Sequence, residues 1–164
     1  RLEGLHTKVG GTRKTTPGMR LLEKMAVKMG GGANHRIGLF DMILIKDNHV
    51  DFAGGITNAV SRAKQWCKDN GKDLKIEVEV RNTPEIMEAL EAGVDRIMLD
   101  NYTPERTAEA VALIREKNPN VEIESSGGIT LDTLRAYGEA GVDFISVGAL
   151  THSVKGLDMS FKAC

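Results

Sequence analysis

The chain has 164 residues, of which 41% are hydrophobic, so it can form one globular domain with a full core. Its 22 basic and 23 acidic residues nearly cancel and form no basic tract, which argues against nucleic acid or a membrane surface as a partner. No apolar run approaches the roughly 18 residues that span a bilayer, and no signal peptide opens the sequence. Cys67 and Cys164 show no metal or redox spacing, so we expect free thiols in a reducing, cytoplasmic compartment.

The first element that the sequence predicts is a helix over residues 17–29. Pro17 suits the first helical position, glycines at 30–32 end the helix, and its apolar residues share one face. These apolar residues are Leu21, Leu22, Met25, Ala26 and Met29.

The rest of the chain alternates strand and helix signals. Apolar or alternating runs predict strands over residues 42–46, 75–80, 96–100, 121–124 and 144–147. Helices are predicted over 56–70 and 131–140, and two more begin at Thr83-Pro84-Glu85 and Thr103-Pro104-Glu105. Each of these starts combines a threonine cap, proline at the first position and an acid in the first turn.

One short sequence occurs twice. Glu91-Ala92-Gly93-Val94-Asp95 returns as Glu139-Ala140-Gly141-Val142-Asp143, each time between a helix and a strand. The glycine suits a left-handed helix end, and the repetition indicates a repeated αβ unit with parallel strands and right-handed crossovers. We therefore predict a parallel α/β barrel of the TIM type, incomplete in this chain, with a doubly wound open sheet as the alternative.

Polar residues follow the predicted strands at their C-terminal ends, which converge on one mouth in a parallel barrel. These residues are Lys46, Glu79, Asp100, Ser126 and Gly148. The turns Ser126-Gly127-Gly128 and Gly148-Ala149 follow the last two strands, where glycine lets backbone amides approach a phosphate. Tight turns without a ligand are the alternative interpretation.

The carboxylates Glu79 and Asp100 end neighbouring predicted strands. Beside a phosphate site, such a pair suits Mg²⁺ held partly by carboxylates and partly by substrate oxygens. A solvated charge at the barrel rim is the alternative for either acid. Glu77 shares the face of Glu79 but lies deeper, so we expect it to pack or to support other site residues.

Basic residues form the other half of the predicted site. The motif Thr12-Arg13-Lys14-Thr15-Thr16-Pro17-Gly18 combines cations with hydroxyls, and Ile45-Lys46-Asp47-Asn48-His49 ends an apolar run with a lysine. Together with His35-Arg36, these cations suit a multiply anionic small molecule, because arginine binds carboxylates in a bidentate manner. Surface salt bridges, or a structural role for His35, are the alternatives. His49 and His152 have no clear role, and with His35 they match no zinc spacing.

These motifs, in this order, resemble the quinolinate phosphoribosyltransferase family, the decarboxylating enzymes that make nicotinate mononucleotide for NAD synthesis. Further segments match the family in order: His35-Arg36, Glu77–Val80, Leu99-Asp100-Asn101, Ser126–Ile129 and Val147–Thr151. The resemblance covers nearly the whole chain. It implies a barrel fold and a pentosyltransferase that joins quinolinate to phosphoribosyl pyrophosphate (PRPP), with Mg²⁺ as cofactor.

The resemblance also implies roles for individual residues. Arg13, His35, Arg36 and Lys46 would line the quinolinate pocket, and Lys14 would reach the pyrophosphate. Glu79 and Asp100 would serve PRPP through its metal and ribose hydroxyls, and the set that would hold the 5-phosphate is Ser126, Gly127, Gly128 and Gly148. The residues expected to act in catalysis are Lys14, Lys46, Glu79 and Asp100.

Relatives carry an N-terminal domain, and part of the barrel, before the point that corresponds to Arg1. We therefore interpret residues 1–164 as one barrel domain that lacks this segment. In the family, the N-terminal domain of a partner subunit in a homodimer closes the site, so a barrel that binds phosphate without turnover is one alternative. A phosphate-binding barrel enzyme of another class and a molybdenum-transport-associated relative are the others.

Overall fold

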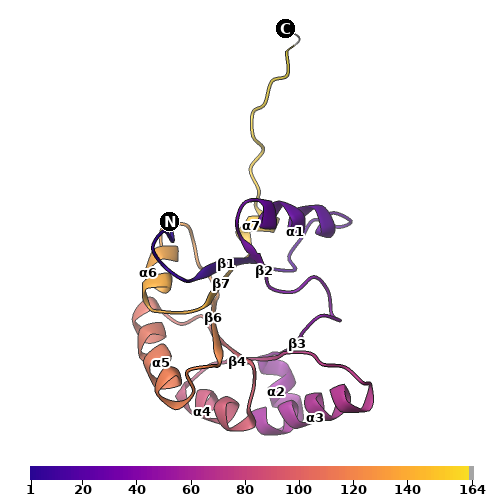
Figure 1. Ribbon diagram of the computed structural model, residues 1–164, viewed down its shortest axis with the longest axis vertical. Helices are drawn as coiled ribbons and strands as arrows, with labels where there is room; N and C mark the ends of the chain where they lie inside the picture. Colours follow the sequence, from indigo (N-terminus) through magenta and orange to yellow (C-terminus); the bar gives the residue numbers. More distant parts are fainter. Residues whose placement is uncertain (163–164) are drawn as a thin grey trace.

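A curled sheet of seven parallel strands forms the centre of the molecule, as the computed structural model describes it for residues 1–162 (Figure 1). In chain order the strands are β1 (Lys8–Gly11), β2 (Ala33–Asn34), β3 (Ile43–Ile45), β4 (Ile76–Val80), β5 (Arg96–Asp100), β6 (Glu122–Ser126) and β7 (Phe144–Val147). Their order in the sheet is β2-β1-β7-β6-β5-β4-β3. The first strand therefore pairs with the last, as it does in a barrel, and the sheet stays open between β2 and β3.

This order distinguishes the two folds that the sequence left open. A doubly wound sheet reverses its strand order at a switch point and builds outward on both sides. Here the strands from β3 to β7 follow one another in chain order and continue to β1 and β2, all in parallel. The incomplete TIM-like α/β barrel is confirmed.

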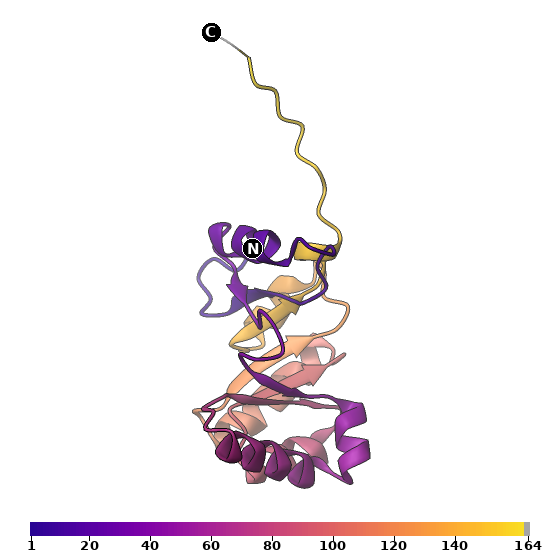
Figure 2. The ribbon, with the colours of Figure 1, turned by 90° about the vertical axis from the view of Figure 1, so that its right-hand side faces the viewer.

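Helices cover the convex side of the curled sheet (Figures 1 and 2). They are α1 (Arg20–Met29), α2 (Asp47–Ala53), α3 (Ile56–Asp69), α4 (Thr83–Ala92), α5 (Pro104–Lys117), α6 (Leu134–Glu139) and α7 (Ala149–His152). Residues 153–162 run away from the barrel as an exposed, extended segment.

Alternation along each strand separates the core from the site. Side chains that face the helices are buried and mostly branched, such as Val78, Ile97, Ile123 and Ile145, and they form one core cluster. The other face, which lines the inside of the curl, carries the polar residues. These are Glu77 and Glu79 on β4, Arg96 and Asp100 on β5, and Glu122, Glu124 and Ser126 on β6.

The repeated sequence has the same structural role in both places, where it connects a helix to the next strand. Gly93 and Gly141 have positive φ angles of 67° and 92°, as the helix ends require. Asp95 then accepts a hydrogen bond from the backbone nitrogen of Ile76 at 2.7 Å, and Asp143 accepts one from Ile123 at 2.7 Å. Each aspartate thus ties the start of its own strand to the start of the neighbouring strand.

Helix α1 differs from the prediction in its start and in its orientation. It begins at Arg20, after a turn that contains Pro17, and it buries only Lys24 and Val27. The apolar face faces outward instead: Leu21 is 66% exposed and Met29 is 84% exposed. The apolar residues share one face, as predicted, but nothing within residues 1–162 covers this face.

Several other elements also differ from the prediction. Strands β1 and β2 and helices α2 and α7 were not predicted, and α6 is shorter than the predicted 131–140. The cap of α4 is Asn82, whose side chain accepts from the backbone nitrogen of Glu85, and not Thr83. Thr103 does cap α5, with Pro104 at the first position.

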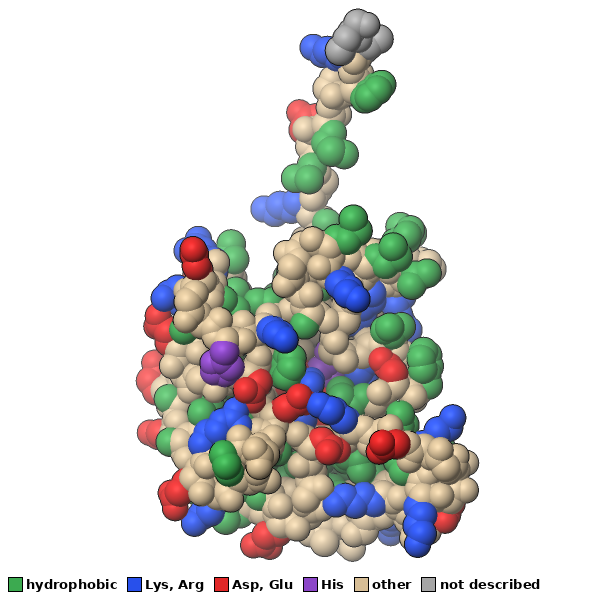
Figure 3. Space-filling model, in the orientation of Figure 1, with side chains coloured by type: hydrophobic (Ala, Val, Ile, Leu, Met, Phe, Trp, Pro, Cys, Tyr) green, Lys and Arg blue, Asp and Glu red, His purple; other side chains and the backbone are tan. Residues whose placement is uncertain are grey.

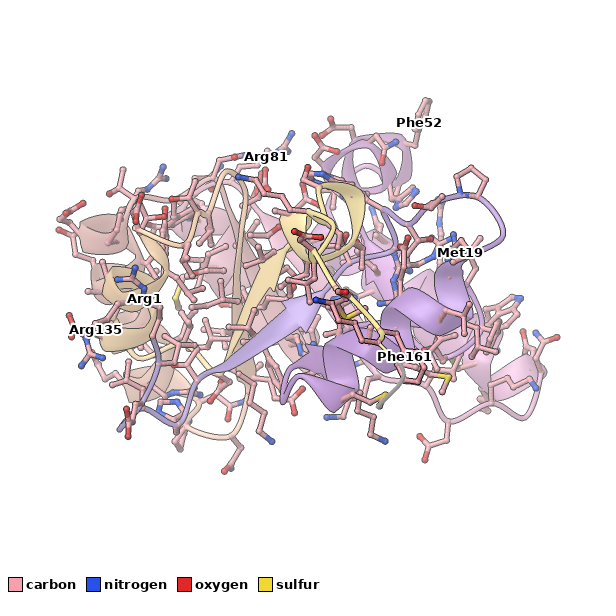
Figure 4. The ribbon with its side chains drawn as sticks, turned by 90° about the horizontal axis from the view of Figure 1, so that it is seen from above. Arg1, Met19, Phe52, Arg81, Arg135 and Phe161 are labelled. Atoms are coloured by element: carbon pink, nitrogen blue, oxygen red, sulfur yellow. The ribbon has the colours of Figure 1, made fainter. Side chains whose placement is uncertain are left out.

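The surface carries further apolar side chains. Phe52, 89% exposed, points outward from α2, and Met19 precedes α1 (Figure 4). Cys67 is a buried free thiol on α3, whereas Cys164 lies outside the described residues. No helix within residues 1–162 combines the length and the apolar character needed to cross a bilayer.

Candidate active site

A cavity of about 320 Å³ opens at the C-terminal ends of the strands. Its size lies within the usual range of small-molecule sites, roughly 300–1,000 Å³. The residues that line it are Thr12, Arg13, Lys14, His35, Arg36, Leu44, Lys46, Met98, Ser126 and Ser146. Figure 3 shows acidic and basic side chains close together near the centre of the face toward the viewer.

The structure brings together the predicted cations, although they come from three separate segments. Arg13 follows β1, Arg36 follows β2 and Lys46 follows β3. The Nε atoms of Arg13 and Arg36 are buried and have no hydrogen-bond partner among the described residues. Burial, and then repulsion from Arg13, lowers the pKa of the Arg36 guanidinium. Two partly buried guanidiniums with free donors suit an anion with carboxylates.

Lys46 lines this cavity, and the two predicted acids lie next to its lining residues. Lys46 Nζ donates to Glu79 Oε2 at 2.8 Å, and Glu79 is 6% exposed. Asp100 ends β5 beside Ser126 and accepts from the side chain of Asn101 at 2.6 Å. Carboxylate oxygens are ligands that Mg²⁺ prefers, and one oxygen of Glu79 is already engaged by Lys46.

The two glycine-containing turns lie beside the cavity. Gly127 has a φ of 101°, and a Cβ there would lie 2.2 Å from Asn101 Oδ1, so the position requires glycine. Gly128 has a φ of 59° and open space around it. At the second turn, Thr151 Oγ1 donates to the carbonyl of Lys14 at 2.6 Å, and Lys14 Cδ lies near Gly148. Lys14 is therefore held next to the predicted phosphate turn.

A cluster of buried polar side chains lies inside the curl. His35 Nε2 lies 2.6 Å from Glu77 Oε2 and 3.4 Å from Glu124 Oε2. Arg96 donates to Glu124 at 3.1 Å, and Ser146 donates to the other oxygen of Glu124. Burial raises the pKa of Glu77 and of Glu124 to about 7, and burial lowers the pKa of His35 to about 4. Glu77 is fully buried and supports His35, which agrees with its predicted secondary role.

His35, Glu77 and Glu124 are also close enough together to hold a metal ion. Arg96 already pairs with Glu124, and both Arg36 and Lys24 repel positive charge at His35. We therefore interpret the cluster as a hydrogen-bonded network. His49 lies elsewhere, where its Nδ1 accepts from the backbone nitrogen of Lys46 at the start of α2, and His152 Nδ1 lies 2.7 Å from Ser153 Oγ.

The raised pKa of Glu124 leads to a testable pH dependence. An acid whose pKa is raised on folding stabilises the fold below its unfolded value near 4.5, and this contribution is lost as pH rises to about 7. The lowered pKa of His35 has the opposite effect on stability, because it favours the folded state as pH rises. It is one group, whereas two acids, Glu77 and Glu124, have raised pKa values. Between pH 5 and pH 8 the free energy of unfolding of the parent should fall. In Glu124→Gln this fall should be smaller by about 1–3 kcal/mol. Urea unfolding at both pH values, with Glu116→Gln as an exposed control, measures the difference; equal pH slopes in Glu124→Gln and the parent would contradict it.

Several residues of this region were not predicted as site residues. Among them, Glu124 belongs to the inner cluster, the backbone nitrogen of Asn101 donates to the carbonyl of Ser126 before the Gly127 turn, and Lys24 is buried beside the cationic segments. The alternation of Glu122, Glu124 and Ser126 along one strand was the signal that could have identified Glu124. Nothing local in the sequence indicates that Lys24 turns inward, because its helix has an apolar face.

An incomplete parallel barrel with a cationic cavity and glycine-rich turns at its mouth defines a class, the barrels that bind phosphate and carboxylate anions. Sequence comparison narrows this class. The family described as "Quinolinate phosphoribosyl transferase, C-terminal domain" matches residues 1–162. The chain belongs to the quinolinate phosphoribosyltransferase family.

Individual relatives support this family assignment. The chain is 47% identical to a chloroplastic nicotinate-nucleotide pyrophosphorylase (carboxylating) of Arabidopsis thaliana, over 92% of this chain and 47% of that protein. It is also 47% identical to a probable enzyme of the same name from Bacillus subtilis, over 97% of this chain and 53% of the relative. The solved structure of nicotinate-nucleotide pyrophosphorylase from Francisella tularensis superposes with a TM-score of 0.85 and 47% identity, over 94% of this chain and 52% of that one. The chain spans about half the length of the curated relatives it matches.

Proposed function

We propose that this barrel carries the catalytic site of a quinolinate phosphoribosyltransferase. The reaction would join the quinolinate nitrogen to ribose C1 of PRPP with loss of pyrophosphate, and then release carbon dioxide to give nicotinate mononucleotide. Family membership supports this activity. The observation that carries it is the cavity in which Arg13, Arg36 and Lys46 meet next to the turns at Ser126 and Gly148.

Each half of the cavity suits one substrate. Arg13 and Arg36 present unpartnered donors, which can form charge-assisted hydrogen bonds with the two carboxylates of quinolinate, and His35 and Lys46 add polar contacts. Lys14, beside Gly148, would meet the pyrophosphate, and the amides around Gly128 would receive the 5-phosphate. Glu79 and Asp100 would hold Mg²⁺ together with PRPP oxygens, and the ion would neutralise charge on the leaving group.

The residues of this chain would act by position and charge. Lys14 stabilises the departing pyrophosphate, and the carboxylate of Asp100 faces the positive charge that develops on the ribose. Once the ring nitrogen carries a bond to ribose, it withdraws electrons from C2, so the carboxyl group leaves as carbon dioxide and C2 takes a proton. This route needs no protein nucleophile.

We also propose that the site is completed by a further segment, in keeping with the family description as a C-terminal domain and with the coverage of about half of each relative. In this proposal the protein forms a homodimer, and the partner subunit supplies the segment. The cytoplasmic localisation stays a prediction, because plant relatives are named as chloroplastic or mitochondrial proteins.

The proposed activity can be tested by measuring nicotinate mononucleotide formed from quinolinate and Mg²⁺–PRPP. By the intact protein we mean this barrel together with the further segment proposed above. In it, Asp100→Asn should lower kcat by roughly 10- to 100-fold, because a neutral amide stabilises neither the metal nor the developing positive charge. Asp69→Asn, on the exposed surface of α3, is the matched control. Absence of product from the intact protein would refute the proposed function, and an unchanged rate in Asp100→Asn would refute the role of that carboxylate.

A further inference from the structure

Helix α1 turns a lysine inward and its apolar face outward. Lys24 is only 2% exposed, and with Val27 it is the contact through which the helix is buried. Its ammonium donates one hydrogen bond, to the carbonyl of Gly11 at 2.8 Å. No carboxylate within residues 1–162 lies at salt-bridge distance from it. A buried, incompletely paired charge is costly for folding.

The contacts of Lys24 join the two segments that supply the guanidiniums. Gly11 is the last residue of β1 and directly precedes Thr12-Arg13-Lys14. The backbone carbonyl of Lys24 accepts from the side chain of Asn34 at 2.9 Å, and Asn34 directly precedes His35-Arg36. The side chain of Lys24 therefore binds the end of β1, and its backbone carbonyl binds the end of β2, at the points where the two cationic segments leave the sheet.

The charge of Lys24 interacts with the charged groups of both cationic segments. Burial lowers the pKa of Lys24 to about 8, Asp41 opposes this shift, and repulsion from Arg20, Arg13 and Arg36 lowers the pKa further. Those groups come from the helix itself, from the loop after β1 and from the segment after β2. Lys24 in turn contributes to the lowered pKa of His35. Lys24 therefore lies among several cations, and Asp41 is the acid that opposes the lowering of its pKa.

We propose that Lys24 is a positioning residue of the dicarboxylate pocket, whose buried ammonium anchors the cationic segment after β1 and is compensated when a dianion binds. The inference rests on the proposed function, because it takes quinolinate as the dianion. Two neighbouring carboxylates at Arg13 and Arg36 favour the charged form of Lys24. Binding above about pH 8 therefore takes up a proton from solvent onto Lys24 Nζ.

The experiment is calorimetric titration of the intact protein at pH 7 and pH 9, in buffers of different ionisation enthalpy. The ligands are quinolinate and benzene-1,2-dicarboxylate, which keeps both carboxylates and lacks the ring nitrogen. We expect proton uptake at pH 9 in the parent protein, and affinity that falls between pH 7 and pH 9. Lys24→Met and Lys24→Gln should lose this uptake and bind about tenfold more weakly at pH 7, which corresponds to one pKa unit of coupling. Lys28→Met, on the exposed side of the same helix, should behave like the parent.

The outcomes separate the inference from the function. Binding without proton uptake by the parent protein overturns the role of Lys24 whether or not the variants fold. Equal affinity and equal pH dependence in Lys24→Gln and the parent also overturn it. If benzene-1,2-dicarboxylate binds with the expected dependence on Lys24 and quinolinate does not bind, the inference stands and the proposed substrate is wrong. If neither ligand binds, both are wrong.

Discussion

The 164-residue chain assayed alone is expected to form little or no nicotinate mononucleotide, while it still binds phosphate or PRPP. The cavity opens at the mouth of an incomplete barrel whose sheet ends at β2 and β3. Closing a site excludes water and strengthens every charge interaction inside it. An open site should therefore lose much more turnover than phosphate affinity, with kcat lower by roughly 100-fold or more than in the intact enzyme.

The phosphate contacts depend less on closure. The backbone nitrogen of Asn101 donates to the carbonyl of Ser126 at the start of the Gly127 turn, and Thr151 binds the carbonyl of Lys14, all within this chain. The measurements are a product assay and a PRPP titration on the purified chain, with and without the N-terminal part of a relative added in trans. Turnover by the chain alone at the rate of an intact enzyme would contradict the prediction, and so would loss of PRPP binding in a folded chain.

The sequence predicted the parts of the fold that depend on local patterns. Strand alternation placed Ile76, Val78 and Val80 on one face and Glu77 and Glu79 on the other, as the structure shows. The repeated glycine and aspartate indicated a repeated αβ unit, and both copies have the geometry that this requires. Parallel pairing then follows, because each unit contains a crossover helix.

The remaining features depend on tertiary contacts. The segment Lys8–Gly11 contains two glycines, which have low strand propensity, and it is a strand because it pairs with β7. Helical periodicity identified the apolar face of α1 but could not say whether that face is covered, and the buried residues are Lys24 and Val27. Likewise, the network of His35 with Glu77 and Glu124 depends on the curl that brings β2, β4 and β6 together.

For the site, the sequence predicted which residues meet but not how they pair. The rule that strand ends converge brought Lys46 and Glu79 to one mouth, and they form an ion pair at 2.8 Å. Arg13 and Arg36 line the cavity itself, whereas Glu79, Asp100 and Gly148 lie next to its lining. Their assigned roles in binding stay predictions.

Substitutions in the dicarboxylate pocket are expected to cause a large loss of quinolinate affinity. Arg36→Ala and Lys46→Ala should each weaken quinolinate binding to the intact protein by roughly 2 kcal/mol or more, because a desolvated carboxylate loses a charge-assisted partner. Arg36 has a buried, unpartnered Nε atom, so its loss removes a donor that no other described residue uses. Removal of Lys46 also leaves Glu79 unpaired beside the pocket, which adds repulsion toward the dianion.

The affinity for PRPP should change much less in either variant, because its phosphates are assigned to Lys14 and to the glycine turns. Calorimetric titration with each ligand separately measures both affinities. Arg62→Ala and Lys68→Ala, which remove exposed cations of α3, control for the change in net charge. Quinolinate affinity that is untouched by both pocket substitutions would show that the dicarboxylate binds elsewhere. Equal loss for quinolinate and PRPP would show that Arg36 and Lys46 support the whole mouth of the barrel and do not select the dicarboxylate.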